Sequence, residues 1–233
     1  MDTQWTESNN PCGLSLPPEA KEMAICDLRI EEYARRRTTA PDPLFEELRK
    51  ETYAKTSNPD MQVGKVEGRF LRLLVELSGA KRIVEFGTFT GYSTMMMASG
   101  LPEEGIIYTL DRDEVTNAIA RKYFARAPYG SKIKPVFGDA RRTMKRLEGP
   151  IDMAFIDADK TSYDLYYEEV VGRLLKPGGL VVLDNTLWNG SVTDPTDDDG
   201  KAIDAMNRKI AKDPRVEAVL LTLRDGVTVA RKK

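Results

Sequence analysis

The sequence contains no histidine, the side chain that proteins use most often to bind transition metals and to move protons near neutral pH. Its two cysteines, Cys12 and Cys26, lack the paired spacing of a zinc site or a disulfide framework. No apolar run approaches the length of a membrane span, and the first 25 residues have no signal-peptide core. We therefore expect a cytoplasmic protein with no membrane partner, in which any metal is held by oxygen atoms.

Neither sign of charge dominates, since 35 lysine and arginine residues face 37 aspartate and glutamate residues, for a formal net charge of −2. This balance gives no electrostatic argument for a nucleic-acid partner and favours small-molecule ligands. The 233 residues, of which 41% are hydrophobic and 31% charged, suffice for one large α/β domain. Residues 1–20 are polar and rich in proline and glycine, which is typical of a flexible arm.

After Ala80, short apolar runs alternate with stretches of helical spacing. Strands are predicted near 82–87, 106–111, 133–137, 151–157 and 180–184, and helices at 91–99, 114–127, 140–147 and 161–175. Such repeated β-α units predict a doubly wound parallel sheet with right-handed crossovers. A helix near 199–212 then leads into strands at 216–223 and 227–231, which Arg224-Asp225-Gly226 should join into an antiparallel hairpin. Upstream, helical spacing appears in two pieces between Leu28 and Ala54 and again at 66–78.

Two of the predicted strands end in acidic residues. Asp157 follows the apolar run 153–156, and Asp184-Asn185 follows the run 180–183. If these strands are neighbours, about 4.8 Å apart, their carboxyl ends meet at the edge where parallel sheets bind ligands. Carboxylate and amide oxygens suit Mg²⁺, with Mn²⁺ and Ca²⁺ as alternatives. Taken singly, each acidic cluster also fits a helix cap or a turn.

A turn with two glycines joins the first predicted strand to the next helix, in the segment Val84-Glu85-Phe86-Gly87-Thr88-Phe89-Thr90-Gly91-Tyr92-Ser93. The glycines let a ligand approach the backbone closely, which suits a nucleoside-like molecule. The turn lacks the third glycine of a dinucleotide fingerprint and the Gly-Lys-Ser/Thr of a P-loop. Glu85 is an awkward charge in a strand unless a cationic ligand such as S-adenosylmethionine faces it.

Acidic residues also follow the second and third predicted strands. Asp111 ends the second strand, where a carboxylate commonly accepts hydrogen bonds from a ribose diol, although a helix cap is the alternative role. Gly138-Asp139-Ala140 follows the third strand, where it would flank an adenine ring. These positions, together with the glycine turn, favour a nucleoside-like ligand over one that carries a pyrophosphate or a triphosphate.

Taken together, these segments resemble the cation-dependent class I O-methyltransferases, the group that contains the caffeoyl-CoA and catechol O-methyltransferases. The similarity runs from about residue 41 to the C-terminus and covers motifs in the same order: Met61-Gln62, Glu67-Gly68-Arg69-Phe70-Leu71, the segment 84–93, Phe155-Ile156-Asp157-Ala158-Asp159-Lys160 and Asp184-Asn185-Thr186-Leu187-Trp188-Asn189-Gly190. The resemblance implies a Rossmann-like α/β fold with a doubly wound, mostly parallel seven-stranded sheet, an antiparallel C-terminal hairpin and N-terminal helices.

The resemblance also implies a domain layout and a set of site residues. Residues 41–233 would form the methyltransferase domain, residues 1–40 would form an arm and helix that contribute to the acceptor pocket, and the protein would be a homodimer. The metal ligands would be Asp157, Asp184 and Asn185, with Asn189 near the substrate. The S-adenosylmethionine pocket would contain Val63, Glu85, Gly87, Thr88, Ser93, Asp111, Asp139, Ala140 and Asp159.

A mechanism follows for an aromatic small molecule with two adjacent hydroxyls. A divalent cation chelating both oxygens would stabilise a phenolate, which has an ordinary pKa of about 10. Without histidine, Lys160 is the candidate to accept the hydroxyl proton next to Asp157, and a salt bridge to nearby aspartates is its alternative role. Trp188 would form a flat wall beside the acceptor, where plain packing is the alternative.

Three other interpretations remain open at the level of sequence. A methyltransferase that needs no metal would use the aspartates only to orient loops. An NAD-dependent oxidoreductase is disfavoured by the missing third glycine and the reversed hairpin. A binding or scaffold protein without turnover is disfavoured because Lys160, Asp157, Asp184 and Asn185 are all present. The acceptor itself, whether a free catechol, a flavonoid or an acyl-CoA ester, is not fixed by these motifs.

Overall fold

The computed structural model describes residues 27–233. Predictions that fall on residues 1–26, namely the flexible arm and the positions of Cys12 and Cys26, lie outside the described residues. Within the part of the chain that is described, no helix combines the length and the apolar character needed to cross a membrane.

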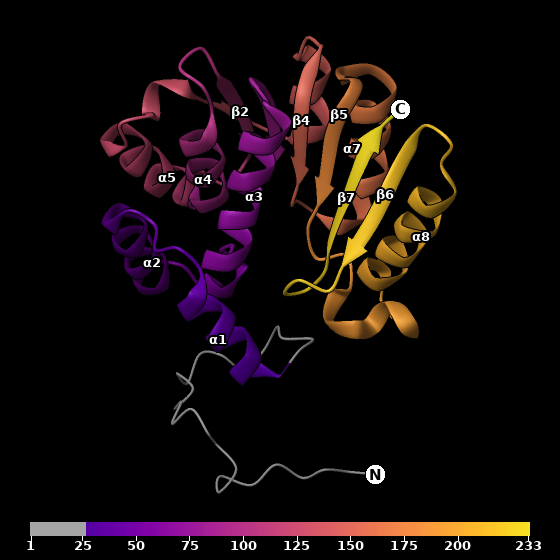
Figure 1. Ribbon diagram of the computed structural model, residues 1–233, viewed down its shortest axis with the longest axis horizontal. Helices are drawn as coiled ribbons and strands as arrows, with labels where there is room; N and C mark the ends of the chain where they lie inside the picture. Colours follow the sequence, from indigo (N-terminus) through magenta and orange to yellow (C-terminus); the bar gives the residue numbers. More distant parts are fainter. Residues whose placement is uncertain (1–26) are drawn as a thin grey trace, which may run out of the picture.

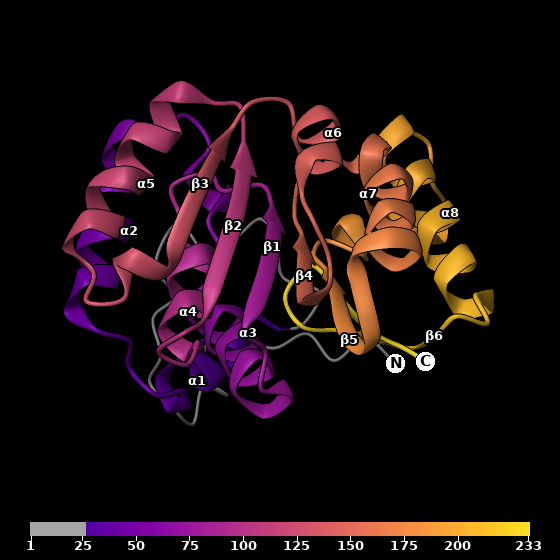
Figure 2. The same ribbon diagram turned by 90° about the horizontal axis from the view of Figure 1, so that it is seen from above.

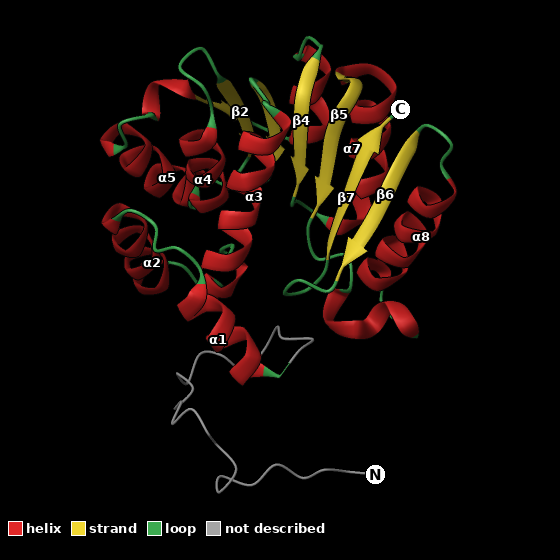
Figure 3. Cartoon of the chain, viewed as in Figure 1, coloured by secondary structure: helices red, strands yellow, loops and turns green. Residues whose placement is uncertain are grey.

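The described residues form a seven-stranded sheet with the strand order β3-β2-β1-β4-β5-β7-β6 (Figures 1 and 3). The strands β1 to β5 run parallel, and β7 lies antiparallel between β5 and β6. The predicted parallel sheet with an antiparallel C-terminal hairpin is therefore confirmed. The strands are β1 (Arg82–Phe86), β2 (Ile106–Asp111), β3 (Ile133–Phe137), β4 (Ile151–Ile156), β5 (Leu175–Leu183), β6 (Val216–Leu221) and β7 (Val227–Lys232).

Helices cover both faces of the sheet (Figure 2). Side chains alternate between the faces along each strand, so that Ile83 of β1 packs with Met95 while Val84 packs with Tyr167. One face carries α1 (Leu28–Arg37), α2 (Pro43–Lys55), α3 (Lys65–Ser78), α4 (Tyr92–Gly100) and α5 (Glu114–Arg126). The other face carries α6 (Ala140–Thr143), α7 (Tyr163–Glu169) and α8 (Asp198–Lys212).

The order of strands opens a crevice between β1 and β4. From β1 the chain moves outward through β2 to β3 and then returns to add β4 on the opposite side of β1. Loops that leave the carboxyl ends of β1 and β4 therefore diverge to opposite faces, which is where doubly wound sheets bind ligands. Beyond the strands the ladder continues, because Asp157 N donates to Phe86 O at 2.8 Å and Asp184 N donates to Ile156 O at 3.1 Å.

The structure differs from the sequence prediction around residues 160–180. The predicted helix 161–175 is a 3₁₀ turn (Lys160–Ser162), α7 and a π-helical turn (Val170–Leu174), and β5 begins at Leu175 rather than at residue 180. Pro177 lacks an amide hydrogen and disfavours helical backbone at the residue before it. The early start of β5 pairs Leu175 with Ile151, and the register shifts between Ile151 and Met153.

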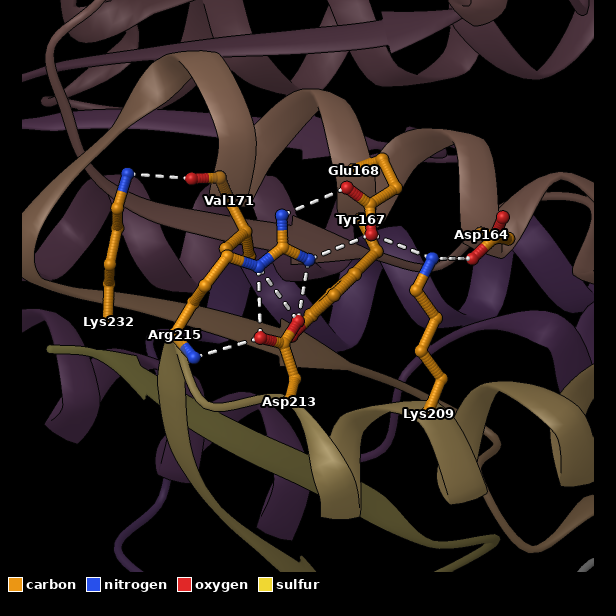
Figure 4. Close-up of polar contacts among 8 residues, drawn as sticks. All are labelled: Asp164, Tyr167, Glu168, Val171, Lys209, Asp213, Arg215 and Lys232. Carbon is orange, nitrogen blue, oxygen red and sulfur yellow. Dashed lines mark hydrogen bonds and ion pairs between the residues drawn. The ribbon is translucent and has the colours of Figure 1, made fainter.

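Polar side chains join the C-terminal hairpin and α8 to α7 (Figure 4). Arg215, which precedes β6, donates to Glu168 at 2.8 and 3.0 Å and pairs with Asp213 at 2.6 Å. Tyr167 donates to the same Asp213 at 2.9 Å, and Lys209 pairs with Glu168 at 2.7 Å. Most of these groups are partly exposed, so each pair contributes little alone, but the network fixes α8 and the turn between α8 and β6 against α7.

The first strand carries a buried carboxylate directly beneath the glycine turn. Glu85 is fully buried and accepts hydrogen bonds from Ser93 Oγ at 2.5 Å, from Thr109 Oγ1 at 2.6 Å and from Thr94 Oγ1. These hydroxyls come from α4 and β2, so the carboxylate ties three elements together below the turn 87–91. Burial raises the pKa of Glu85 to about 7, although the three hydroxyl donors oppose that rise.

We expect Glu85→Gln to remove a pH dependence of stability. Because the folded-state pKa of about 7 lies above the ordinary value of 4.5, the contribution of Glu85 to the free energy of unfolding is greatest below pH 4.5 and declines as pH rises to 7. The size of the decline is about 3 kcal/mol. The stability of Glu85→Gln relative to wild type, measured by denaturant unfolding, should therefore rise by about that amount from pH 4.5 to 8.

The matched control for this prediction is Glu103→Gln, which changes an exposed glutamate in a loop. Its stability difference from wild type should stay constant over the same pH range. A constant difference for Glu85→Gln as well would contradict a raised pKa at this position.

Candidate active site

A cavity of about 930 Å³ lies at the carboxyl ends of β1, β2, β4 and β5. It brings together residues from the glycine turn, from the loop before α3 and from the ends of the four strands. The predicted site residues that line it are Val63, Gly87, Thr88, Ser93, Asp111, Asp139, Ala140, Asp157, Asp159, Lys160, Asp184, Asn185, Trp188 and Asn189. Residues that the sequence places far apart thus share one cavity.

Glu85 is the predicted cofactor-binding residue that the structure does not place on the cavity wall. Its side chain is fully buried behind Ser93, which does line the cavity and donates to it. The structure therefore gives Glu85 a supporting position below the turn. The strand in which it lies had suggested a direct contact with a cationic ligand, but its hydrogen bonds are made to three hydroxyl groups instead.

The glycine turn is shaped by close contact with the neighbouring strand end. Gly87 has φ 97°, and a Cβ at this position would lie 1.8 Å from the carbonyl oxygen of Asp157. Glycine is therefore required here for steric as well as conformational reasons. Asp111 fastens the turn from the other side, because its Oδ2 accepts from Thr88 N at 2.9 Å and from Phe89 N at 2.8 Å. Its Oδ1 accepts from Asp113 N at 2.9 Å.

Two acidic residues, Asp139 and Asp159, continue the cavity along the strand ends. Asp139 caps α6 through Arg141 N at 3.0 Å, and its ion pair with the Arg141 side chain lowers the pKa of Asp139 to about 2. Asp159 accepts from Tyr166 Oη at 2.8 Å, and the Tyr166 ring packs on Phe86 with centroids 4.8 Å apart. The carboxylates are therefore held in place by the protein before any ligand binds.

Four predicted residues meet at the end of the cavity next to β4 and β5. Lys160 Nζ donates to Asp157 Oδ1 at 3.1 Å and to Asn185 Oδ1 at 2.7 Å. Asn185 N donates in turn to Asp184 Oδ1 at 2.6 Å. Lys160 is only 8% exposed, and its ammonium also donates to Tyr163 Oη at 2.7 Å. We call Asp157, Lys160, Asp184 and Asn185 the acidic end of the cavity.

Negative charge exceeds positive charge around the acidic end. Asp184 and Glu67 are 2% and 1% exposed, and burial raises the pKa of both, with the charge of Asp157 adding to the effect. Two cationic side chains lie in the same region, Lys160 and Arg224, and Arg224 Nη1 is 3.2 Å from Glu67 Oε2. A bound cation would relieve the remaining repulsion between the carboxylates.

The donor set at the acidic end fits a hard divalent cation by its chemistry. Asp157 and Asp184 offer carboxylate oxygens and Asn185 an amide oxygen, the ligand types that Mg²⁺ and Ca²⁺ take. Within residues 27–233, no three histidine, cysteine, aspartate or glutamate side chains are arranged to hold a metal ion. Two carboxylates and an amide would therefore have to suffice, with water or acceptor oxygens as the other ligands.

Tyr163 and Asp225 were not predicted as site residues, yet both orient groups at the acidic end. Tyr163 is fully buried, donates to Asp184 O at 3.0 Å, and has a pKa that burial raises well above 10. Asp225 accepts from Asn189 N at 2.6 Å and from Asn185 Nδ2 at 3.3 Å. The sequence signal for Asp225 was its place in the hairpin turn, which by itself indicates only a turn former.

The segment that holds Trp188 and Asn189 leaves the strand with unusual backbone angles. Both residues have positive φ, 46° and 52°, in a short turn (Trp188–Thr193). The hydrogen bond to Asp225 helps to hold Asn189 in this conformation. The ring of Trp188 has its centroid 5.7 Å from Lys160 Nζ, so that it forms part of the cavity wall beside the proposed proton acceptor.

Comparisons with known proteins show the family to which the chain belongs. A family model described as O-methyltransferase matches residues 36–233. The chain is 39% identical over 181 residues to caffeoyl-CoA O-methyltransferase 2 of Zea mays, covering 71% of this chain and 68% of that protein. It is 34% identical over 189 residues to tricin synthase 1 of Oryza sativa subsp. japonica, covering 74% and 75%.

Solved structures give the same assignment. The O-methyltransferase of Bacillus cereus in complex with SAH superimposes with a TM-score of 0.81 at 31% identity, covering 88% of this chain and 97% of that one. TomG of Streptomyces achromogenes in complex with SAM has a TM-score of 0.81 at 27% identity, covering 88% and 96%. The chain belongs to the caffeoyl-CoA O-methyltransferase-like family of S-adenosylmethionine-dependent O-methyltransferases.

Proposed function

We propose that this enzyme methylates one hydroxyl of a catechol-type small molecule and that the reaction depends on a divalent cation, Mg²⁺ before Mn²⁺ or Ca²⁺. The observation that carries the proposal is the convergence of Asp157, Asp184 and Asn185 beside the cofactor turn, where buried carboxylates outnumber cationic side chains. When bound there, the cation would hold two adjacent acceptor oxygens and lower the pKa of the hydroxyl to be methylated.

The reaction asks the protein chiefly to align two bound molecules. The new oxygen–carbon bond forms as the carbon–sulfur bond breaks, and the electron pair of that bond stays on sulfur. The hydroxyl proton would pass to Nζ of Lys160 in its neutral amine form, so the ammonium must first release one proton to solvent. Tyr163, whose pKa is raised by burial, stays protonated and holds the ammonium by accepting a hydrogen bond from it at 2.7 Å.

The test of this proposal is methyl transfer to a panel of catechols before and after metal removal. Treatment with EDTA should lower turnover by at least about 100-fold, since Lewis-acid stabilisation contributes several kcal/mol, and Mg²⁺ should restore it. Asp184→Asn should lower turnover similarly at limiting metal. Affinity for S-adenosylhomocysteine, measured by calorimetry, should change little in both cases, because the glycine turn and Asp111 are untouched.

Other outcomes of this experiment contradict particular parts of the proposal. Turnover that survives thorough chelation would favour the metal-independent methyltransferase. Turnover with monohydroxy phenols equal to that with catechols would exclude chelation of two adjacent oxygens.

For Lys160 we expect replacement by methionine to lower kcat by about 10²–10⁴-fold, the usual contribution of a positioned acid–base group. The long apolar side chain of methionine keeps most of the packing against Tyr163 and Trp188. Lys160→Arg is the matched control, because it keeps the charge pairing with Asp157 but is not able to accept a proton at neutral pH. Activity of Lys160→Met within a few-fold of wild type would show that Lys160 has only a structural role.

Negative charge gathers where the segment of residues 188–200 borders the cavity. Residues 188–200 contain Asp194, Asp197, Asp198 and Asp199 and no lysine or arginine. Asp199 lines the cavity together with Trp188, and the two aspartates before it are exposed. A coenzyme A ester would bring several phosphate charges to this side, which these carboxylates repel. We therefore propose a free, neutral or cationic catechol as the acceptor.

This charge argument predicts an order among acceptors of similar size. Dopamine should have a kcat/KM several-fold above that of 3,4-dihydroxyphenylacetate at low ionic strength, and added salt should reduce the difference. The double substitution Asp198→Asn and Asp199→Asn should also reduce the difference in kcat/KM between the two acceptors. Asp197 is left intact because it caps α8 through Gly200 N at 2.7 Å. A preference for the anionic catechol or for caffeoyl-CoA would refute this choice of acceptor.

A further inference from the structure

Arg224, in the turn between β6 and β7, has a backbone conformation that is unfavourable for its residue type. Its φ is 51°, in the left-handed region that glycine and asparagine adopt most readily. Such a conformation persists in a non-glycine residue when surrounding contacts hold it in place. The contacts of the Arg224 side chain therefore indicate what this residue does.

The Arg224 side chain spans two segments far from it in sequence. Nη2 donates to the carbonyl oxygens of Asp60 at 2.8 Å and Gln62 at 3.1 Å, and Nη1 donates to Glu67 Oε2 at 3.2 Å. The guanidinium is mostly buried, with 19% of the side chain exposed, and Glu67 neutralises its charge. The loop of residues 58–63 is thus tied by its own backbone to the C-terminal hairpin.

The loop 58–63 is also hydrogen-bonded to the glycine turn of residues 87–91. Gln62 Nε2 donates to Thr90 Oγ1 and to Thr52 Oγ1, both at 2.9 Å, and all three side chains are buried. Thr90 lies between the two glycines of the turn. Asn58, Met61, Gln62 and Val63 line the cavity. The loop therefore connects Arg224 with the part of the backbone that receives the cofactor.

We infer that Arg224 is a positioning residue for the cofactor: it holds the loop 58–63 against the cavity and, through Gln62, fixes the turn that binds S-adenosylmethionine. The planar guanidinium reaches two carbonyls and one carboxylate at once, which a lysine ammonium on a flexible stem does not reproduce. Arg224 also lines the cavity, but its nitrogens donate to the loop and to Glu67, so its effect on the methyl donor passes through the loop. Its effect is to reduce the motion of the loop and so the ordering required when the cofactor binds.

The experiment compares Arg224→Gly and Arg224→Lys with wild type. Glycine suits a φ of 51°, so Arg224→Gly relieves the backbone while it removes the side chain. We expect the dissociation constant for S-adenosylhomocysteine to rise about tenfold in Arg224→Gly, the effect of losing hydrogen bonds from a charged group. Arg224→Lys should show an intermediate rise in the dissociation constant. Lysine keeps the positive charge beside Glu67 but lacks the planar guanidinium that reaches several acceptors at once.

Two further measurements distinguish positioning from a general loss of structure. Amide hydrogen exchange of residues 56–64 should become faster in Arg224→Gly, while exchange in β4 stays as in wild type. The effects of Arg224→Gly and Gln62→Ala on the dissociation constant should be less than additive, because both act through one loop.

Specific results would overturn the inference. A dissociation constant within twofold of wild type in Arg224→Gly, or unchanged exchange in residues 56–64, contradicts it. If Arg224→Gly does not fold, the same measurements on Arg224→Lys decide, and wild-type affinity there overturns the inference. The metal-free protein serves for all of these measurements, so the result does not depend on the proposed cation.

Discussion

The contact between Gly87 and the backbone of Asp157 is the constraint on which the site depends. Because Gly87 has no Cβ, the glycine turn passes directly over the end of β4. A Cβ at this position would lie 1.8 Å from the Asp157 carbonyl oxygen. The strand order provides this contact, because β1 and β4 are neighbours whose following loops leave in opposite directions. The glycine turn and the acidic end are therefore adjacent because of backbone geometry. Their side chains complete the site but are not needed to bring its two parts together.

The electrostatics of the site follow from placing several carboxylates at one buried edge. Burial and the proximity of Asp157 raise the pKa of both Asp184 and Glu67. Each nearby cation has a separate partner: Lys160 bonds to Asp157 and Asn185, and Arg224 bonds to Glu67. Both cations line the cavity, but Lys160 lies next to Trp188 whereas Arg224 donates to carbonyl oxygens of the loop before α3. The two positive charges are therefore held at separate places on the cavity wall.

Sequence reasoning succeeded where the chemistry follows the strand ends. The apolar runs located all seven strands, and because parallel strands end at one edge, the predicted site residues Asp111, Asp157 and Asp184 line one cavity. It was less accurate where tertiary contacts decide. Glu85 was expected to face a ligand, but hydroxyls on α4 and β2 enclose it. The role of Arg224 depends on carbonyl groups more than 160 residues away in the chain, and β5 begins early because it pairs with Ile151. Local patterns do not contain such information.

The two ends of the cavity are built by different kinds of structure. One end consists of strand ends and the glycine turn, whose geometry the sheet imposes, and the SAM-bound and SAH-bound structures each superimpose on this chain with a TM-score of 0.81. The other end consists of the turn at Trp188–Thr193 and the acidic start of α8, neither of which belongs to the sheet. Loops tolerate substitution better than strands do. Asp225 holds Asn189 and Arg224 holds the loop 58–63, so the β6–β7 turn connects two loop segments of the cavity to the sheet.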